Sequence, residues 1–272
     1  MKMSAQANSS PMPPLVLLAG GLATRLRPIT TKIPKSMVTV AGEPFVAHQL
    51  RLLARQGATD IVMCVGYLGE QIQEFAGDGS SYGCRVRYCF DGDKLKGTGG
   101  AIQAALPLLG DHFFVMYGDS YLPTAFAPVY ERYRSSGLQG LMTVFKNDNR
   151  WDKSNVQFED GQIIRYDKRT PTPAMNYIDY GLGILRSESF EEFRASDVFD
   201  LALVYESLVA RKQLAGYEVM ERFFEIGSHE GLNEMDAIFL DLPKGASRDL
   251  QAGANNSAVE AVSGSVRTGE GL

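Results

Sequence analysis

Residues 15–28 read LVLLAGGLATRLRP, and this stretch decides the fold class. Leu15–Ala19 is a short run of apolar residues, as expected for a strand buried on both faces of a sheet. Gly20 and Gly21 open a loop at the carboxyl end of this strand, which is where open α/β sheets bind ligands. Glycines let backbone N–H groups approach an anion closely, and the guanidinium of Arg25 pairs well with phosphate. The stretch therefore predicts an α/β sheet. Its loop fits either an anion site or a structural turn with two surface arginines, Arg25 and Arg27, because its spacing matches neither the GxGxxG fingerprint nor the P-loop.

The rest of the chain alternates strand-like and helix-like patterns. In the first half we expect strands at Ile61–Val65, Val86–Phe90 and Phe113–Tyr117, and helices from Pro44 to Gly57, over Leu68–Phe75 and over Thr98–Leu109, where Pro107 bends or ends the helix. In the second half we expect strands at Leu141–Phe145, Asn155–Phe158, Ile163–Asp167 and Tyr177–Leu185, a hairpin turn at Glu159–Gly161 and a helix over Leu201–Leu208. The first half predicts a doubly wound sheet, which the second half extends without a linker. We therefore expect one domain over residues 14–244, a disordered lead-in over 1–13 and a flexible tail over 245–272.

The composition excludes several classes of function. The 272 residues carry 27 Lys+Arg against 32 Asp+Glu, so the net charge is −5, and no basic block points to a nucleic acid. No apolar run approaches the roughly 18 residues that cross a membrane, and the N-terminus lacks the apolar core of a signal peptide. Cys64, Cys84 and Cys89 make no disulfide framework, and the three histidines show no ligand spacing. We expect a cytoplasmic protein with buried free thiols and structural or exposed histidines, with no nucleic-acid or membrane partner, and homo-oligomerisation stays open.

Three motifs between residues 17 and 45 occur in a fixed order. They read GGxxTRLxPxT from Gly20, PKxM from Pro34 and VxGxP from Val40. This run resembles the sugar-1-phosphate nucleotidylyltransferase family, and the likeness extends over about residues 15–240. The resemblance implies a Rossmann-like, GT-A-like nucleotidyltransferase fold, with a mixed, mostly parallel sheet flanked by helices. It also implies an enzyme that joins a nucleoside triphosphate to a sugar 1-phosphate and releases pyrophosphate. The family commonly has glycine where this chain has Ala23, which we expect to alter the loop around the triphosphate without abolishing it.

Two further turns resemble the family's nucleobase site. Residues 65–68 match the turn that edges the base pocket, and Gly97–Ala101 matches the Gly-rich turn beside the base and ribose. We expect Thr98 to cap the helix that starts there, with the first N–H groups of the helix pointing outward. The nucleotide-binding residues that the resemblance implies are Ala19, Gly20, Gly21, Thr24, Gly66, Gly97, Thr98 and Gly99.

Two acidic positions match the family's metal ligands. Asp119 follows an apolar strand and lies beside a glycine, a setting in which a carboxylate can hold Mg²⁺. Residues 223–228 read FFEIGS and resemble the family's WxDxGT, so Glu225 stands where the family has its second metal-binding carboxylate. The resemblance thus implies Mg²⁺ as the cofactor, although Glu225 is one methylene longer than the family's aspartate.

The resemblance also assigns the charged side chains of the reaction. Arg25 and Lys35 would offset charge on the triphosphate, and Lys168 matches the family lysine that meets the sugar phosphate. Residues 177–183 match a strand that lines the sugar pocket, where Asp179 would accept hydrogen bonds from sugar hydroxyls. The catalytic residues implied are Arg25, Lys35 and Lys168, and the sugar-binding residues are Asp119, Lys168, Asp179 and Gly181.

Four segments carry a narrower likeness to the D-glycero-D-manno-heptose 1-phosphate guanylyltransferases. They are residues 117–122, 154–156, 177–182 and 222–228. This likeness favours GTP and a heptose or manno-configured sugar 1-phosphate as substrates. Transfer from UTP, CTP or dTTP stays open, and so does a non-catalytic subunit of the same fold that senses a nucleotide sugar. A glycosyltransferase is disfavoured, because the chain has PKxM and we expect it to have no Asp-x-Asp metal motif.

Overall fold

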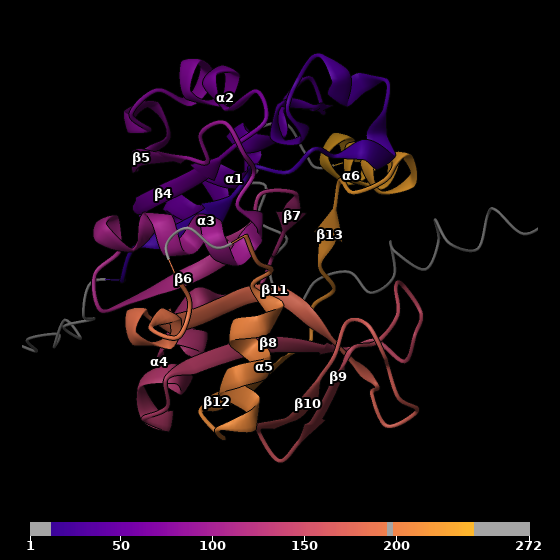
Figure 1. The fold of residues 1–272 in the computed structure, drawn as a ribbon. Helices are drawn as coiled ribbons and strands as arrows, with labels where there is room; N and C mark the ends of the chain where they lie inside the picture. The colour runs from indigo at the N-terminus through magenta and orange to yellow at the C-terminus, as the bar shows by residue number, and fades with distance from the viewer. Residues whose placement is uncertain (1–11, 195–197, 242–272) are drawn as a thin grey trace, which may run out of the picture.

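The computed structural model describes residues 12–194 and 198–241, and a nine-stranded sheet runs through them (Figure 1). In the order of the sheet, its strands are β5 (Arg85–Phe90), β4 (Asp60–Val65), β1 (Leu15–Leu18), β6 (His112–Tyr117), β11 (Tyr177–Arg186), β8 (Gly140–Lys146), β12 (Leu214–Val219), β10 (Gln162–Tyr166) and β9 (Val156–Glu159). The expected tail over 245–272 lies outside the described residues, as does the expected lead-in apart from its last two residues.

The strand directions confirm a mixed, mostly parallel sheet. β5, β4, β1 and β6 are parallel neighbours, which is the doubly wound half that the first 117 residues predict. β11 runs antiparallel to both β6 and β8, and β10 runs antiparallel to both β12 and β9, while β12 is parallel to β8. The carboxyl ends of β1, β4, β5 and β6 therefore meet at one edge of the sheet.

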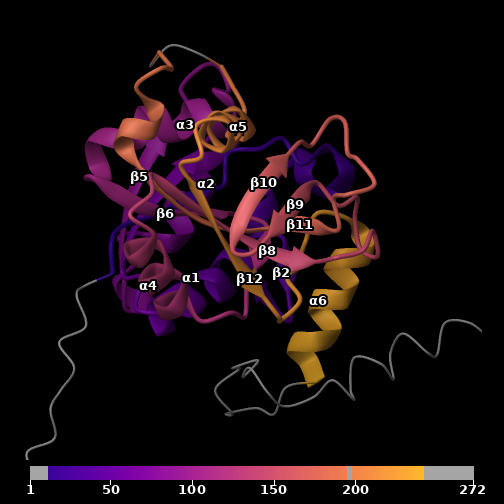
Figure 2. The ribbon, with the colours of Figure 1, turned by 90° about the horizontal axis from the view of Figure 1, so that it is seen from below.

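Helices cover both faces of this sheet, and each face has its own apolar core. The helices are α1 (Phe45–Arg55), α2 (Gly69–Ala76), α3 (Gly97–Ala105), α4 (Phe126–Ser136), α5 (Ala202–Ala210) and α6 (His229–Asp241). α3 and α5 lie on one face, and α1 and α4 on the other (Figure 2). Successive residues of β4 alternate between the two cores: Ile61 and Met63 face α1, whereas Val62 and Cys64 face α3. None of the helices within the described ranges is long and apolar enough to span a bilayer.

Most of the expected elements are present, and their ends have local causes. The expected helix over Thr98–Leu109 ends at Ala105 and continues as a single 3₁₀ turn that contains Pro107. The hairpin turn between β9 and β10 has positive φ at Asp160 (48°) and Gly161 (77°), the conformation that tight hairpins require. The expected free thiols are confirmed, with Cys89 half-buried and the other two cysteines buried.

Several elements have no strong pattern in the sequence and were not predicted. They are α4, α6, β12 and two short ribbons, β2 (Thr39–Val40) with β3 (Glu43–Pro44), and β7 (Ser120–Tyr121) with β13 (Phe224–Glu225). β12 includes Gly216, which lowers its strand propensity, and the ring of Phe158 packs where a Cβ of that glycine would stand. Two-residue strands show no alternation at all, so only the three-dimensional contacts reveal them.

Candidate functional site

A pocket of about 550 Å³ opens where the parallel strands β1, β4, β5 and β6 end. The loops after β1, β5 and β6 supply most of its wall, and α3 begins at its side. This is the edge at which open α/β sheets bind ligands. Of the residues predicted from the sequence, its lining includes Ala19, Gly20, Gly21, Thr24, Arg25, Lys35, Gly97, Thr98 and Asp119.

Gly20 and Gly66 bring two loops into direct contact beside the pocket. A Cβ on Gly66 would lie 2.7 Å from the carbonyl oxygen of Gly20, and one on Gly20 would lie 3.1 Å from the nitrogen of Gly66. Side chains would force these loops apart, so both glycines shape the wall. Gly21 differs, because no heavy atom lies within 4 Å of the place where its Cβ would stand. Its backbone is therefore open to a bound anion.

Ala23 adopts a conformation that favours glycine. Its φ and ψ are both 47°, in the left-handed region, which explains why glycine is common at this position in the resembling family. The alanine carbonyl accepts hydrogen bonds from the Thr30 hydroxyl (2.8 Å) and the backbone N–H of Leu26 (3.1 Å). The loop thus keeps its turn with alanine in place, and the following Arg25 remains in the pocket wall.

The predicted cap of α3 by Thr98 is wrong. α3 begins at Gly97 without a side-chain cap, and the Thr98 hydroxyl accepts a hydrogen bond from the backbone N–H of Leu201 (2.8 Å). The N–H of Gly99 donates to the carbonyl of Phe199 (3.0 Å), and the Phe199 ring occupies the space above Gly99. The Gly-rich turn thus lies under a segment some 100 residues away, while Gly97 and Thr98 still line the pocket.

A two-stranded ribbon joins the two predicted metal carboxylates. β7 pairs antiparallel with β13, which sets Ser120 opposite Glu225. The backbone N–H of Ile226 also donates to the carbonyl of Asp119 (2.9 Å). Asp119 and Glu225 are 106 positions apart in the chain, yet this ribbon brings them to one end of the pocket.

Lys35 lies between these carboxylates. Its Nζ is 2.5 Å from Asp119 Oδ2, and the side chains of this pair are 17% and 28% exposed. A Cβ on Gly227 would lie 3.5 Å from Lys35 Nζ and 3.0 Å from Glu225 Oε1, so Lys35 and Glu225 both adjoin that glycine. One ammonium and two carboxylates therefore form a single cluster in which negative charge is in excess.

The surroundings of Glu225 act on its ionisation. Burial raises the pKa of Glu225 above its ordinary value, and the negative charges of Asp119 and Asp152 raise it further, whereas Lys35 and Arg25 act in the opposite direction. A divalent cation would relieve this repulsion, and carboxylate oxygens are the ligands that Mg²⁺ prefers. Within residues 12–194 and 198–241 no three His, Cys, Asp or Glu side chains converge on one point, whereas Mg²⁺ typically uses one or two carboxylates together with substrate phosphates. The donor set present fits that pattern.

A second charged group adjoins the pocket at Tyr117, which lines it. Lys168 Nζ lies over the rings of Tyr117 (5.6 Å) and Tyr166 (5.8 Å), and 3.5 Å from the Tyr117 hydroxyl. Burial raises the pKa of Asp179, while the charge of Lys168 and hydrogen bonds from the Gly181 N–H (3.0 Å) and the Tyr166 hydroxyl (3.4 Å) favour its ionised form. Gly181 has a φ of 96° in an irregular part of β11, close to the Tyr117 ring. The structure thus brings Lys168, Asp179 and Gly181 together, whereas Asp119, the other predicted sugar-binding residue, pairs with Lys35.

Asp91 is a pocket residue that the sequence analysis missed. It directly follows β5, and its Oδ2 lies 3.1 Å and 3.5 Å from where Cβ atoms of Gly66 and Gly20 would stand. Burial raises the pKa of Asp91, and the backbone N–H of Lys96 donates to it weakly (3.3 Å). A polar residue at the carboxyl end of a parallel strand is the signal that could have found it, as it found Asp119. The expectation that the chain has no Asp-x-Asp motif is wrong, because residues 91–93 form one, although only its first carboxylate lines the pocket.

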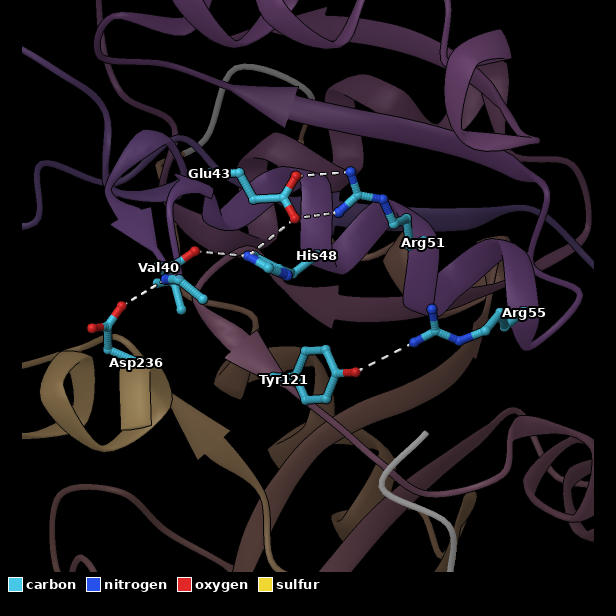
Figure 3. A network of polar contacts seen from close by, with 8 residues as sticks. Val40, Glu43, His48, Arg51, Arg55, Tyr121 and Asp236 are labelled. Atoms are coloured by element: carbon cyan, nitrogen blue, oxygen red, sulfur yellow. Dashed lines mark hydrogen bonds and ion pairs between the residues drawn. The ribbon is translucent and has the colours of Figure 1, made fainter. Parts of the chain in front are cut away.

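A polar network holds α6 and the β2–β3 hairpin against α1 (Figure 3). The buried His48 forms a hydrogen bond through Nε2 with a carbonyl of β2 (2.9 Å), and its ring contacts Phe239 of α6, with centroids 4.3 Å apart. Asp236 of α6 accepts a hydrogen bond from the N–H of Ala41 (2.6 Å). Figure 3 also shows Glu43 in contact with both Arg51 and His48, and Arg55 donating to the Tyr121 hydroxyl. Because α6 follows β13, this network also supports the position of Glu225.

Comparison with known proteins agrees with this geometry. The sequence pattern of the family described as Nucleotidyl transferase matches residues 15–237. N-acetylmuramate alpha-1-phosphate uridylyltransferase from Neisseria meningitidis is 30% identical over 229 residues, which are 82% of this chain and 96% of that protein. Mannose-1-phosphate guanyltransferase from Saccharomyces cerevisiae is 27% identical over 249 residues, which are 88% of this chain and 68% of that protein. The structure of HddC from Yersinia pseudotuberculosis superposes with a TM-score of 0.70 at 24% identity, covering 84% of this chain and all of that one.

The matched region contains every strand of the large sheet and both carboxylates of the ribbon. The chain therefore belongs to the nucleotidyl transferase family, and its enzymatic class is that of the sugar-1-phosphate nucleotidylyltransferases. The fold and family predicted from the motifs are confirmed. The narrower likeness to heptose 1-phosphate guanylyltransferases stays a prediction, since the relatives include both a uridylyltransferase and a guanyltransferase.

Proposed function

We propose that the enzyme transfers GMP from GTP to a heptose or manno-configured sugar 1-phosphate. The observation that most supports transfer from a triphosphate to a sugar phosphate is the continuity of the site. A glycine-lined anion pocket ends in the cluster of Lys35, Asp119 and Glu225, and the Lys168–Asp179 group adjoins it through Tyr117. The arrangement offers one place for a triphosphate, one for a cation and one for a second phosphate.

The chemistry needs positioning and charge compensation more than proton transfer. An oxygen of the sugar phosphate attacks the α-phosphorus of GTP in line. The new P–O bond forms as the bond from the α-phosphorus to the α–β bridging oxygen breaks, and pyrophosphate leaves. Arg25 and Lys35 would hold the triphosphate, and Lys168 would hold the attacking phosphate against the repulsion between two anions.

Asp119 and Glu225 would hold Mg²⁺, and their mutual repulsion supports this assignment. When bound, the ion neutralises charge on the phosphate oxygens. Lys35 contributes a fixed positive charge in the same cluster, 2.5 Å from Asp119. Chelation is expected to stop turnover.

Asp91 supports guanine as the base. A carboxylate accepts hydrogen bonds, and guanine offers the adjacent donors N1–H and N2–H₂ on one edge. Uracil offers one N–H between two carbonyl oxygens, which a carboxylate repels. Asp91 lies against the contact of Gly20 with Gly66 in the pocket wall, and this position supports its proposed role in distinguishing the two bases.

A second candidate function is uridylyl transfer, which the 30% identical uridylyltransferase favours. The deciding experiment measures pyrophosphate release for GTP, UTP, CTP and dTTP, each with mannose, glucose, N-acetylglucosamine, N-acetylmuramate and heptose 1-phosphates. We expect the highest kcat/KM with GTP and a heptose or mannose 1-phosphate. A highest value with UTP would contradict guanylyl transfer and leave the enzyme class intact. Absence of pyrophosphate in every combination would favour a non-catalytic subunit.

Asp91→Asn tests the base assignment separately. Loss of one charged acceptor is expected to lower kcat/KM for GTP by about 10- to 100-fold, since each polar contact of this kind contributes roughly 1–3 kcal/mol. The matched control is Asp93→Asn, because Asp93 is exposed two positions away. Equal effects of both variants would contradict a role for Asp91 in reading the base.

A further inference from the structure

Trp151 is the only tryptophan of the chain, and it is 49% exposed although its surroundings hold it firmly. The guanidinium of Arg222 lies over the indole, 3.5 Å from the ring centroid. Glu234 of α6 accepts two hydrogen bonds from this guanidinium (2.5 and 2.9 Å), which fixes its plane. The indole is thus backed by a fixed cation while much of its surface stays open to a ligand.

The loop that carries Trp151 is specified by its own side chains. Asn147 is fully buried, donates to the carbonyl of Asp152 (2.6 Å) and accepts from the N–H of Trp151 (3.3 Å). The Asn149 carboxamide oxygen accepts from the N–H of Ser154 (2.9 Å), and the Ser154 hydroxyl accepts from the N–H of Asn149 (3.1 Å). These bonds hold a backbone with positive φ at Asp148 and Asn149, so the loop presents the indole in one orientation.

The same loop stands at the sugar side of the site. It joins β8 to β9, and Tyr177 at the start of β11 pairs with both Lys146 at the end of β8 and Val156 at the start of β9. The Asn155 side chain, next in the loop, accepts a hydrogen bond from the backbone N–H of Asp179 (3.0 Å). The loop is therefore bonded directly to the strand that carries the proposed sugar-binding carboxylate.

Arg222, which contacts the Trp151 indole, connects this residue to the proposed metal carboxylates. Arg222 lies three residues before Glu225 on the segment that enters β13. Arg222, which contacts the indole, thus connects Trp151 to the segment that carries Glu225. Trp151 thus contacts the segment that leads to Glu225 and lies on a loop that is bonded to the strand of Asp179.

We propose that Trp151 is a specificity-determining residue on which the pyranose ring of the acceptor lies, an inference that rests on the proposed sugar-1-phosphate transfer. A pyranose has a face made largely of C–H groups, and an aromatic ring buries such a face favourably. A sugar that turns a hydroxyl toward the indole loses hydration there without gaining a partner. Arg222 is the positioning residue that keeps the ring in this orientation.

Intrinsic fluorescence of the full chain tests this directly, because all tryptophan emission comes from Trp151. Mannose 1-phosphate is titrated in the presence of Mg²⁺ and a non-hydrolysable GTP analogue, and inorganic phosphate is titrated as the control that lacks a sugar ring. We expect a saturable emission change with the sugar phosphate, centred near its KM, and none with inorganic phosphate. Equal responses to both would overturn the proposal.

Kinetics of variants provide the second readout. Trp151→Ala is expected to raise the acceptor KM about tenfold with the GTP KM unchanged, Trp151→Tyr to stay within about threefold, and Arg222→Gln to fall between them. Met220→Ala is the matched control, since Met220 is 79% exposed on the segment that carries Arg222. Unchanged acceptor KM in Trp151→Ala, or an equal rise in both KM values with a lower Tm, would overturn the proposal while the function stands. Absence of turnover by the wild type with any substrate pair would instead overturn the proposed function and the inference together.

Discussion

Replacing Lys35 by alanine tests whether the charge of this side chain acts mainly on catalysis or on the stability of the fold. The ammonium contacts Asp119 at 2.5 Å and lies next to Glu225 across Gly227, so it faces the place where phosphate oxygens would meet the carboxylates. The substitution removes this charge and leaves the backbone of the short 3₁₀ helix at Lys35–Met37 unchanged. Activity and stability are therefore expected to respond very differently.

The magnitudes follow from distance and exposure. Two unit charges 4 Å apart near a protein surface attract by about 4 kcal/mol, and removal of one such donor from a transition state typically lowers the rate by about 10²–10³. The ion pair itself is partly exposed, at 17% and 28%, so its contribution to the free energy of unfolding is about 1 kcal/mol or less. A domain of this size changes its Tm by roughly 2–4 °C per kcal/mol.

The assay is pyrophosphate release beside thermal unfolding, with Lys35→Arg as the matched variant that keeps the charge. We expect Lys35→Ala to lose at least about a hundredfold in kcat with a Tm within a few degrees of the wild type. Because the charge of Lys35 lowers the pKa of Glu225, its removal is also expected to move the acid limb of the pH profile to higher pH. Near wild-type kcat in a folded Lys35→Ala protein would refute the reasoning.

Three other substitutions or modifications have clear expectations. Burial raises the pKa of Glu225, and a carboxyl group with a raised pKa favours folding below its unfolded pKa and disfavours it above its folded pKa. Without metal, Glu225→Gln should therefore increase the free energy of unfolding at pH 7, and urea titrations should show this increase vanishing toward about pH 4.5. The same substitution should nearly abolish turnover. Gly66→Ala should lower the free energy of unfolding by roughly 1–3 kcal/mol, since its Cβ would lie 2.7 Å from a backbone oxygen, and an unchanged urea midpoint would contradict the close contact. A hydrogen bond with the Cys64 thiol and the charge of Lys96 lower the pKa of Cys89 to about 7, whereas burial raises the pKa of Cys84. Mass spectrometry should therefore show that iodoacetamide modifies Cys89 faster than Cys84, at a rate that rises through pH 7. Faster modification of Cys84 would contradict this prediction.

The sequence predicts the parallel half of the sheet well because each of its strands carries a dense local signal. Strands buried on both faces are continuous apolar runs, and the motifs follow them directly, so Asp119 could be placed at a strand end from the pattern alone. Contacts across long sequence distances carry no such signal. The Thr98 hydroxyl bonds to Leu201 rather than to its own helix, and the Phe199 carbonyl takes the N–H of Gly99, which no local rule for helix caps anticipates. Asp91, in contrast, could have been predicted from the sequence, because it also directly follows a parallel strand, as Asp119 does.

Glu225 shows how a site adapts to a longer carboxylate, since the resembling family has aspartate there. In this structure the extra methylene brings Oε1 to 3.0 Å from the position of a Cβ on Gly227, and the Glu225 carboxyl carbon to 3.4 Å. The bare backbone of Gly227 thus provides the space that the longer side chain occupies, and φ at Gly227 is not in the glycine-only region. Gly227→Ala should therefore displace the carboxylate and lower kcat about tenfold or more in the wild type.

The shorter aspartate would not reach that methyl group. In a Glu225→Asp background, Gly227→Ala should thus have a much smaller effect on kcat, giving a coupling of roughly 1–2 kcal/mol in a double-mutant cycle measured by pyrophosphate release. Tm values of all four proteins serve as the control for folding. Additive effects of the two substitutions would show that Gly227 does not accommodate Glu225, and that the glutamate reaches the metal position by another path.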